Sequence, residues 1–162
     1  MRNVAALILA LTLALPSTSS ASAIRTYCAV SDTRQNGTSA AFVNLGTDHT
    51  GNATGSTLKF HAARKGPGTI TVSAECTVRG GPTDSLNVDI LVNGAQIPPM
   101  RGGDTALCVG AGNRGGRTMM ASTTIPHRFA RGDQRVRVRV RPLNGAEWNL
   151  DDVSLTVILQ KR

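Results

Sequence analysis

The sequence predicts an all-β fold, an antiparallel two-sheet sandwich of the jelly-roll kind, with an immunoglobulin-like sandwich as the second choice. Apolar and polar residues alternate with a period of two along several segments, which is the pattern of strands with one buried face. Helical periodicity is almost absent. Turn signals separate about eight to ten such segments, and strands with a single apolar face need a second sheet to cover them.

The first 23 residues have the features of an export signal. Arg2 supplies a positive start, Val4–Leu15 is an uncharged apolar run, and Ala21–Ala23 offers the small residues that signal peptidase reads. The run is shorter than the roughly 20 residues that a membrane span needs, and no later stretch is long and apolar enough for one. We expect residues 1–23 to be removed and residues 24–162 to form a single secreted or periplasmic domain.

Strand signals follow in order along the rest of the chain. The strongest lie at 69–78, 87–92, 134–142 and 153–160, where Val, Ile, Leu, Ala or Cys occupies every second position. Asn-Gly pairs at 36–37, 93–94 and 144–145 predict hairpin turns, since both residues tolerate a positive φ. Weaker signals predict strands at Ser39–Asn44, Thr57–Ala62, Ala95–Pro98, Ala106–Val109 and Arg117–Ile125.

Three cysteines remain after export, and an oxidising compartment favours pairing of two of them. The sequence does not settle the connectivity. We favour Cys76–Cys108, because both lie in strand-like segments, whereas Cys28 lies beside the expected mature terminus and is either free or a link between two chains. The favoured bridge closes a loop of about 32 residues, worth roughly 3–4 kcal/mol in the chain-entropy model.

The chain is basic and poor in aromatic residues. It has 18 Lys and Arg against 10 Asp and Glu, and loss of the signal would leave a charge of +7. Such a charge favours anionic partners, which outside a cell means acidic polysaccharides or other cell-surface polymers. Specific nucleic-acid recognition is not expected, because no aromatic side chains interleave with the cations to form a stacking platform.

The segment "QRVRVRVRP" carries the strongest charge pattern. Its arginines stand two residues apart, so they share one face of a strand at spacings of about 6.7 Å. Neighbouring exposed cations at that distance repel by only about 0.6 kcal/mol in water, so a solvated face is the simplest interpretation, and an acid such as Glu147 could relieve it. The functional hypothesis is a polyanion-binding patch made by Arg128, Arg131, Arg135, Arg137, Arg139 and Arg141.

A resemblance covers about 90 residues, from Ser73 to Gln160. The series "SAECTV", "LNVDILVNG", "DTALCVG" and "EWNLDDVSLTVILQ" resembles a group of exported bacterial β-sandwich domains of unassigned function. The resemblance implies the Cys76–Cys108 pairing and a jelly roll broadly similar to TNF and C1q-like domains, and by analogy a trimer. The chain departs from the group at Asn93, where Asp is usual, and in its arginine row.

Catalytic and metal signals are weak. The three histidines have no metal-ligand spacing, no GxSxG is present, and Asp151-Asp152 are better explained as turn residues than as a Ca²⁺ site. We expect no cofactor, no metal and no enzymatic activity.

The export signal and the arginine row together favour a secreted binding or structural domain that contacts an anionic polymer. One alternative is a carbohydrate-binding module with Trp148 as its stacking face. The other is a structural homo-oligomer.

Overall fold

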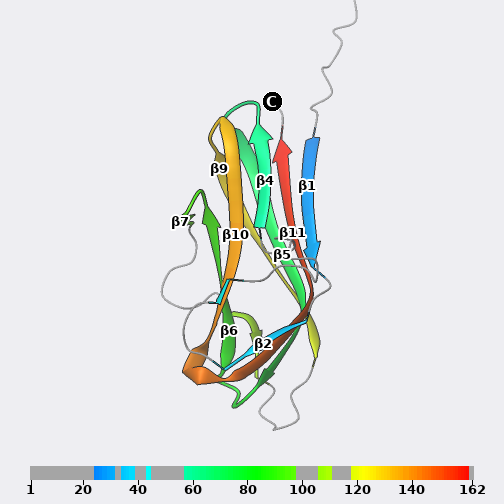
Figure 1. Ribbon diagram of the computed structural model, residues 1–162, viewed down its shortest axis with the longest axis vertical. Coiled ribbons are helices and arrows are strands. Elements are labelled where there is room, and N and C mark those ends of the chain that lie inside the picture. Colours follow the sequence, from blue (N-terminus) through cyan, green and yellow to red (C-terminus); the bar gives the residue numbers. More distant parts are fainter. Residues whose placement is uncertain are drawn as a thin grey trace, which may run out of the picture.

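The computed structural model describes residues 24–31, 34–38, 43–44, 57–97, 106–110 and 118–160. The expected signal of residues 1–23 and most of the strand expected at Ser39–Asn44 lie outside the described residues. Two antiparallel sheets pack face to face in a molecule that is elongated along its strands (Figure 1). The predicted all-β sandwich is confirmed. Within the described residues, no helix is long and apolar enough to cross a membrane.

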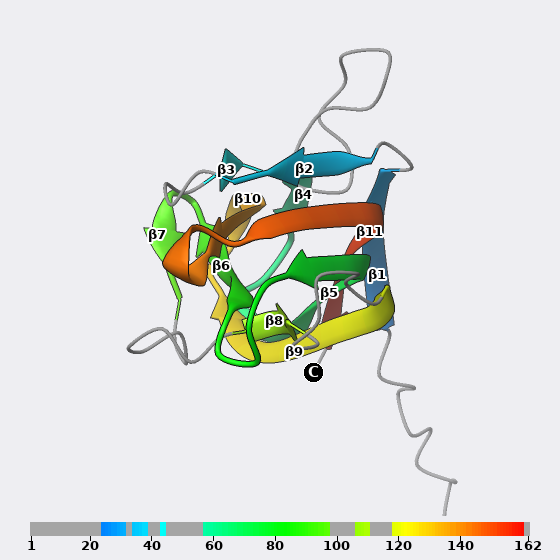
Figure 2. The same ribbon diagram turned by 90° about the horizontal axis from the view of Figure 1, so that it is seen from below.

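The first sheet has the order β1-β11-β5-β9, with the short β2 paired to β11. The second has the order β3-β10-β6-β7, with β4 paired to β10 and β8 paired to β6. Seen along the long axis, β11, β5 and β9 lie side by side with β1 at one edge (Figure 2). The strands are β1 (Ile24–Ser31), β2 (Gln35–Gly37), β3 (Val43–Asn44), β4 (Thr57–Ala62), β5 (Gly66–Arg79), β6 (Ser85–Val92), β7 (Ala95–Gln96), β8 (Ala106–Val109), β9 (Met119–Phe129), β10 (Gly132–Pro142) and β11 (Glu147–Gln160).

The strand order identifies a jelly roll. Apart from the short β2, β3 and β7, the first strand pairs with the last and the second with the last but one: β1 with β11, β4 with β10, β5 with β9 and β6 with β8. Such nested pairing is produced when one long hairpin rolls up into two Greek keys. An immunoglobulin-like sandwich orders its strands differently, so that alternative is wrong.

Alternation along the long strands builds the core, as the sequence predicts. In β5 the inward residues Ile70, Val72 and Val78 are fully buried, and in β10 the three valines between the arginines are fully buried too. Aliphatic side chains supply most of this core because aromatic residues are few. Burying such side chains contributes about 1.5–3 kcal/mol each and is the main force that holds the sheets together.

Three local features differ from the sequence-based expectations. The strand β1 was not expected, because its segment "IRTYCAVS" alternates weakly and only its last residue is buried. The strands β9 and β11 are longer than expected. Asn93-Gly94 and Asn144-Gly145 have the positive φ values of turns, but Asn36-Gly37 lies in β2, so that turn prediction is wrong. A Cβ at Gly37 would come within 3.1 Å of the Trp148 ring, so close packing explains this glycine.

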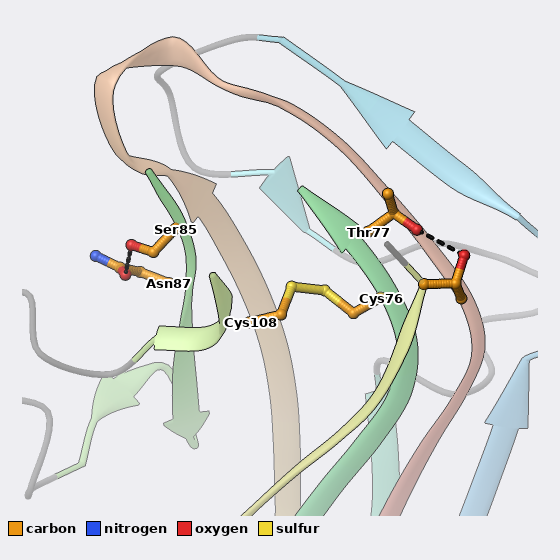
Figure 3. The surroundings of a disulfide bond; sticks show 6 residues. Cys76, Thr77, Ser85, Asn87 and Cys108 are labelled. Carbon is orange, nitrogen blue, oxygen red and sulfur yellow. Dashed lines mark hydrogen bonds between the residues drawn. A yellow bond between two sulfur atoms is a disulfide. The ribbon is translucent and has the colours of Figure 1, made fainter. Parts of the chain in front are cut away.

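The disulfide joins Cys76 and Cys108, as expected, and it connects the two sheets. Cys76 lies on β5 and Cys108 on β8, which belongs to the opposite sheet, and their side chains meet across the space between them (Figure 3). Their Cα atoms are 6.4 Å apart, and 32 positions separate them in the sequence. The bridge therefore fastens β8 to the core at the end of the sandwich that holds the β5–β6 turn.

An aromatic cluster closes the opposite end of the core. The rings of Tyr27 and Phe60 stack at 4.5 Å, Phe60 meets Phe129 edge-on at 5.5 Å, and Phe129 meets His127 at 4.7 Å. The Tyr27 hydroxyl also donates to the carbonyl oxygen of His61 at 3.3 Å. These contacts tie β1, β4 and β9 together across both sheets, and edge-on and stacked rings add about 0.5–1.5 kcal/mol each beyond their burial.

Replacing both bridged cysteines by alanine should lower the free energy of unfolding by about 3–4 kcal/mol, because the unfolded chain gains the entropy of an unclosed loop. Urea titration followed by circular dichroism measures the change. Cys28→Ser is the control, since Cys28 is exposed and free. A double variant as stable as the control would contradict a stabilising role for the bridge.

The imidazole of His127 should make the fold sensitive to mild acid. Partial burial lowers the pKa of His127 below its ordinary 6.5. Its contribution to stability is therefore complete above pH 6.5 and is lost as the pH falls toward the folded-state pKa, because protons then bind the unfolded chain preferentially. The melting temperature of His127→Gln should fall less between pH 7.5 and 5.5 than that of the wild type. An equal fall in both proteins would contradict this explanation.

Candidate functional site

The arginine row lies on the outer face of β10, as the alternation predicts, but its members are not equivalent. Arg135 is exposed, whereas Arg137, Arg139 and Arg141 are half-buried. The difference follows from the neighbouring strands: Arg135 lies opposite Lys59 on β4, while the other three lie opposite Leu91, Asp89 and Asn87 of β6. The row thus combines one exposed cation with three side chains that pack on the sheet.

Arg139 is the counter-ion of a buried carboxylate. Its Nε and Nη2 atoms donate to Oδ2 of Asp89 at 3.0 and 2.9 Å, and the Asp89 side chain is only 7% exposed. Gln96 on β7 donates to the other oxygen, Oδ1, at 3.1 Å. A buried carboxylate needs such partners because it has lost its hydrating water.

Arg139 therefore has a structural role within the proposed patch. The expected partner Glu147 instead bonds Arg79 at 3.1 Å, so Glu147 does not relieve the row.

Exposed cations gather at the end of the sandwich that the aromatic cluster closes, and we call this surface the basic end. It lies at the top of Figure 1, where β4 turns into β5, β9 turns into β10, and β11 ends. All of its basic side chains are exposed, and none of them forms an ion pair with a carboxylate of the described residues. They are Arg25, Lys59, Arg64, Lys65, Arg128, Arg131 and Arg135.

Among the residues that the structure describes, acidic and basic side chains are segregated along the long axis. Asp133 is the single described carboxylate at the basic end, and it lies 2.7 Å from Nδ1 of His61. The other six described carboxylates lie in the middle of the sandwich or toward the far end: Glu75, Asp84, Asp89, Glu147, Asp151 and Asp152. Because the fields of clustered like charges add, the electrostatic potential at the basic end is positive.

Packing beneath the basic end fixes where its cations stand. Lys59 and Arg128 each directly precede a ring of the aromatic cluster, Phe60 and Phe129. Arg25 lies two residues before Tyr27 on the same face of β1. Lys59 and Arg135 lie directly opposite one another on β4 and β10. The Cβ atoms of such a pair are about 5 Å apart, and two like charges in this arrangement lower the stability of the sheet.

A pocket of about 350 Å³ opens at this end. Its lining comes from the start of β1, the turn between β4 and β5, β9 and the end of β11. Four of the lining residues are basic, and none is acidic: Arg25, Arg64, Lys65 and Arg128. The remaining wall is largely apolar and includes Ala63, Pro67 and Leu159.

A second hollow, of about 390 Å³, lies on the outer face of the first sheet toward the far end. Its charges are balanced: Arg34 donates to Oδ2 of Asp151 at 3.0 Å, and Glu75 lies directly opposite Asp151 on the neighbouring strand. Thr77 and Asn149 occupy the next pair of opposite positions. We call this surface the polar groove, and it offers both donors and acceptors.

The structure corrects the role expected of Trp148. The ring is fully buried, packs in the core and is covered by Gly37. A buried ring has no face for a sugar, so the stacking hypothesis is wrong. Asp151-Asp152 do not form a turn between strands either: they lie at a β-bulge within β11, where Asp152 has a φ of 49°.

Cys28 is free and exposed at the outer edge of the first sheet, where Thr156 donates to its Sγ at 3.6 Å. Its role as a link between chains stays a prediction. Among the described residues, no three His, Cys, Asp or Glu side chains converge on a metal-sized site.

No known family model matches the sequence, and no curated protein sequence is significantly similar to it. The family resemblance drawn from the sequence motifs therefore stays a prediction.

Several solved structures are weakly similar to this chain. A family 35 carbohydrate-binding module from an environmental isolate is 18% identical, with a TM-score of 0.38 over 80% of this chain and 85% of that one. A CBM36-1 domain of a multidomain xylanase from the hindgut metagenome of Trinervitermes trinervoides is 13% identical, with a TM-score of 0.41 over 82% and 96%. Eiger TNF from S. frugiperda is 12% identical, with a TM-score of 0.40 over 83% and 93%. Similarity at this level transfers no ligand, and the jelly-roll assignment depends on the strand order itself.

Arg139→Ser should lower the free energy of unfolding by about 3 kcal/mol, because it leaves the buried Asp89 without its charged partner. Arg137→Ser removes the same charge from a neighbouring position on the same face and should cost about 1 kcal/mol or less. Urea titration of both variants gives the comparison. Equal losses would show that Arg139 is an ordinary surface residue.

Proposed function

We propose that this domain binds an anionic polymer or polymer-coated surface through its basic end. The observation that carries the proposal is the segregation of charge. Of the residues that the structure describes, seven exposed basic side chains share one end with one carboxylate. Guanidinium and ammonium groups suit phosphate, sulfate and carboxylate, and a polyanion that releases its counterions offsets the repulsion between clustered cations.

The proposal relocates the site that the sequence predicted. Arg128, Arg131 and Arg135 belong to the basic end, whereas Arg139 is committed to Asp89. Arg137 is half-buried lower on β10 and forms the margin of the surface, whereas Arg141 is half-buried near the far end of the strand and lies outside it. Cations from β1, β4 and the β4–β5 turn take their place, so the patch crosses from one sheet to the other over the end of the sandwich.

A neutral carbohydrate is the second candidate, and the polar groove favours it. Carboxylates at Glu75 and Asp151, the Asn149 amide and the Thr77 hydroxyl stand at neighbouring positions and could hydrogen-bond the hydroxyl groups of a sugar. Binding there would be insensitive to salt and would be lost in Glu75→Gln. Binding of an anionic polymer at the basic end would instead weaken as the salt concentration rises.

Retention on a sulfated polysaccharide column, measured as a function of salt, tests the proposal. Arg64→Ser combined with Lys65→Ser should elute at clearly lower salt than the wild type, and the slope of log affinity against log salt should fall by about two. Arg34→Ser combined with Arg79→Ser removes the same charge at the far end and should elute close to the wild type.

The control variant should fold, because both of its ion pairs are exposed and such pairs contribute about 1 kcal/mol or less. Equal shifts in the two double variants would mean that net charge alone governs retention, and the proposal would be wrong. Failure of the wild type to bind any anionic polymer would reject it as well.

A further inference from the structure

The pocket at the basic end has a feature that binding of a flexible, extended polyanion does not need: four cations surround a hollow. An open surface suffices to hold a flexible charged chain, whereas here Arg25, Arg64, Lys65 and Arg128 surround a hollow of about 350 Å³. They come from β1, the β4–β5 turn and β9, which are far apart in the sequence. The fold brings them together at one opening.

The balance of charge in this pocket contrasts with that of the polar groove. The two hollows have similar volumes, about 350 and 390 Å³. In the groove, Arg34 is matched by Asp151, and Glu75 stands beside them. In the pocket, four cations face no acidic lining residue. Walls of low dielectric concentrate the field of such a cluster, so the pocket favours an anion more strongly than the open surface does.

The apolar walls of the pocket set a second condition on the ligand, beyond its negative charge. Ala63, Pro67 and Leu159 present apolar surface below the cations, and Gln160 supplies an amide at the rim. A bare inorganic ion would leave this apolar surface in water. A ring-sized organic body would cover it, and the volume lies within the range of pockets that hold small ligands.

We propose that this pocket binds one anionic sugar unit, whose sulfate, phosphate or carboxylate faces the four cations while its ring covers the apolar wall. The inference rests on the proposed function and deepens it: the pocket holds a single acidic residue of the polymer that the basic end attracts. Arg25, Arg64 and Arg128 offer planar forks of donors that suit oxyanions, and Lys65 offers a point charge.

Small probes test the pocket directly by isothermal titration calorimetry or by NMR shifts of the folded domain. The probes are glucose 6-sulfate, glucose 6-phosphate and glucuronate. Two compounds are the controls: glucose, which lacks the charge, and inorganic sulfate, which lacks the ring. At least one acidic sugar should bind tenfold or more tightly than either control. Binding of inorganic sulfate as tight as that of every acidic sugar would mean an adventitious ion only, and the proposal would be wrong.

Two kinds of variant separate the pocket from the surface around it. Ala63→Leu narrows the pocket without changing its charge, and it should weaken the acidic sugar at least tenfold while leaving the slope of log affinity against log salt on the column unchanged, because the number of cations is the same. Arg128→Ser, at an exposed position, is the second pocket variant in case Ala63→Leu does not fold, and it too should weaken the acidic sugar. Lys59→Ser combined with Arg135→Ser lies outside the pocket and should reduce retention while leaving the sugar affinity within about twofold.

The outcomes distinguish the two proposals. Retention on the column without binding of any acidic sugar would reject the pocket and leave the polymer-binding function in place. Binding of the sugar that is indifferent to Ala63→Leu and Arg128→Ser would also reject the pocket as its site. Binding of the sugar without any retention would reject the polymer proposal alone, and the absence of both would reject both.

Discussion

The structure depends on the burial of two aliphatic faces against one another. Because the chain has few aromatic residues, most of the core comes from the alternate Val, Ile, Leu and Ala positions of β5, β6, β10 and β11. A one-residue shift in any of these strands would carry its apolar set to the solvent side, so the register is fixed by burial. The outward positions are then free to carry any polar side chain, and the difference between Arg135 and Arg139 arises entirely on that outward face.

Stability and the proposed binding surface occupy different parts of the sandwich. The disulfide joins the two sheets toward the end that holds the β5–β6 turn, and the Asp89–Arg139 pair lies midway along β6 and β10. The basic end has neither. Its cohesion comes from the stacked and edge-on rings of Tyr27, Phe60 and Phe129, which are insensitive to salt and hold three strands beneath the cations. Repulsion among the cations therefore acts on a part of the fold that apolar contacts support.

The sequence predicts the central strands well, since their alternation is strong and burial enforces it. Two strands with weaker signals, Thr57–Ala62 and Ala106–Val109, also have the bounds that the sequence predicts. The strand β1 was not expected, because it lies at an edge, exposes most of its residues and needs no apolar period. The choice between a jelly roll and an immunoglobulin-like sandwich also lay beyond local pattern, because it depends on which distant strands pair.

The candidate site could be predicted only in part, and for the same reason. A row of arginines on one strand is visible in the sequence, so Arg135 was found, but the partner that sets Arg139 apart lies 50 positions away on β6. The pocket was missed because Arg25, Arg64 and Arg128 lie far apart in the sequence, and only the nested pairing of the jelly roll brings them to one end. Outward-facing cations on one strand are spread along the sheet, whereas strand ends and turns converge. A concave anion site is therefore more readily built where strands end than along the arginine row of β10.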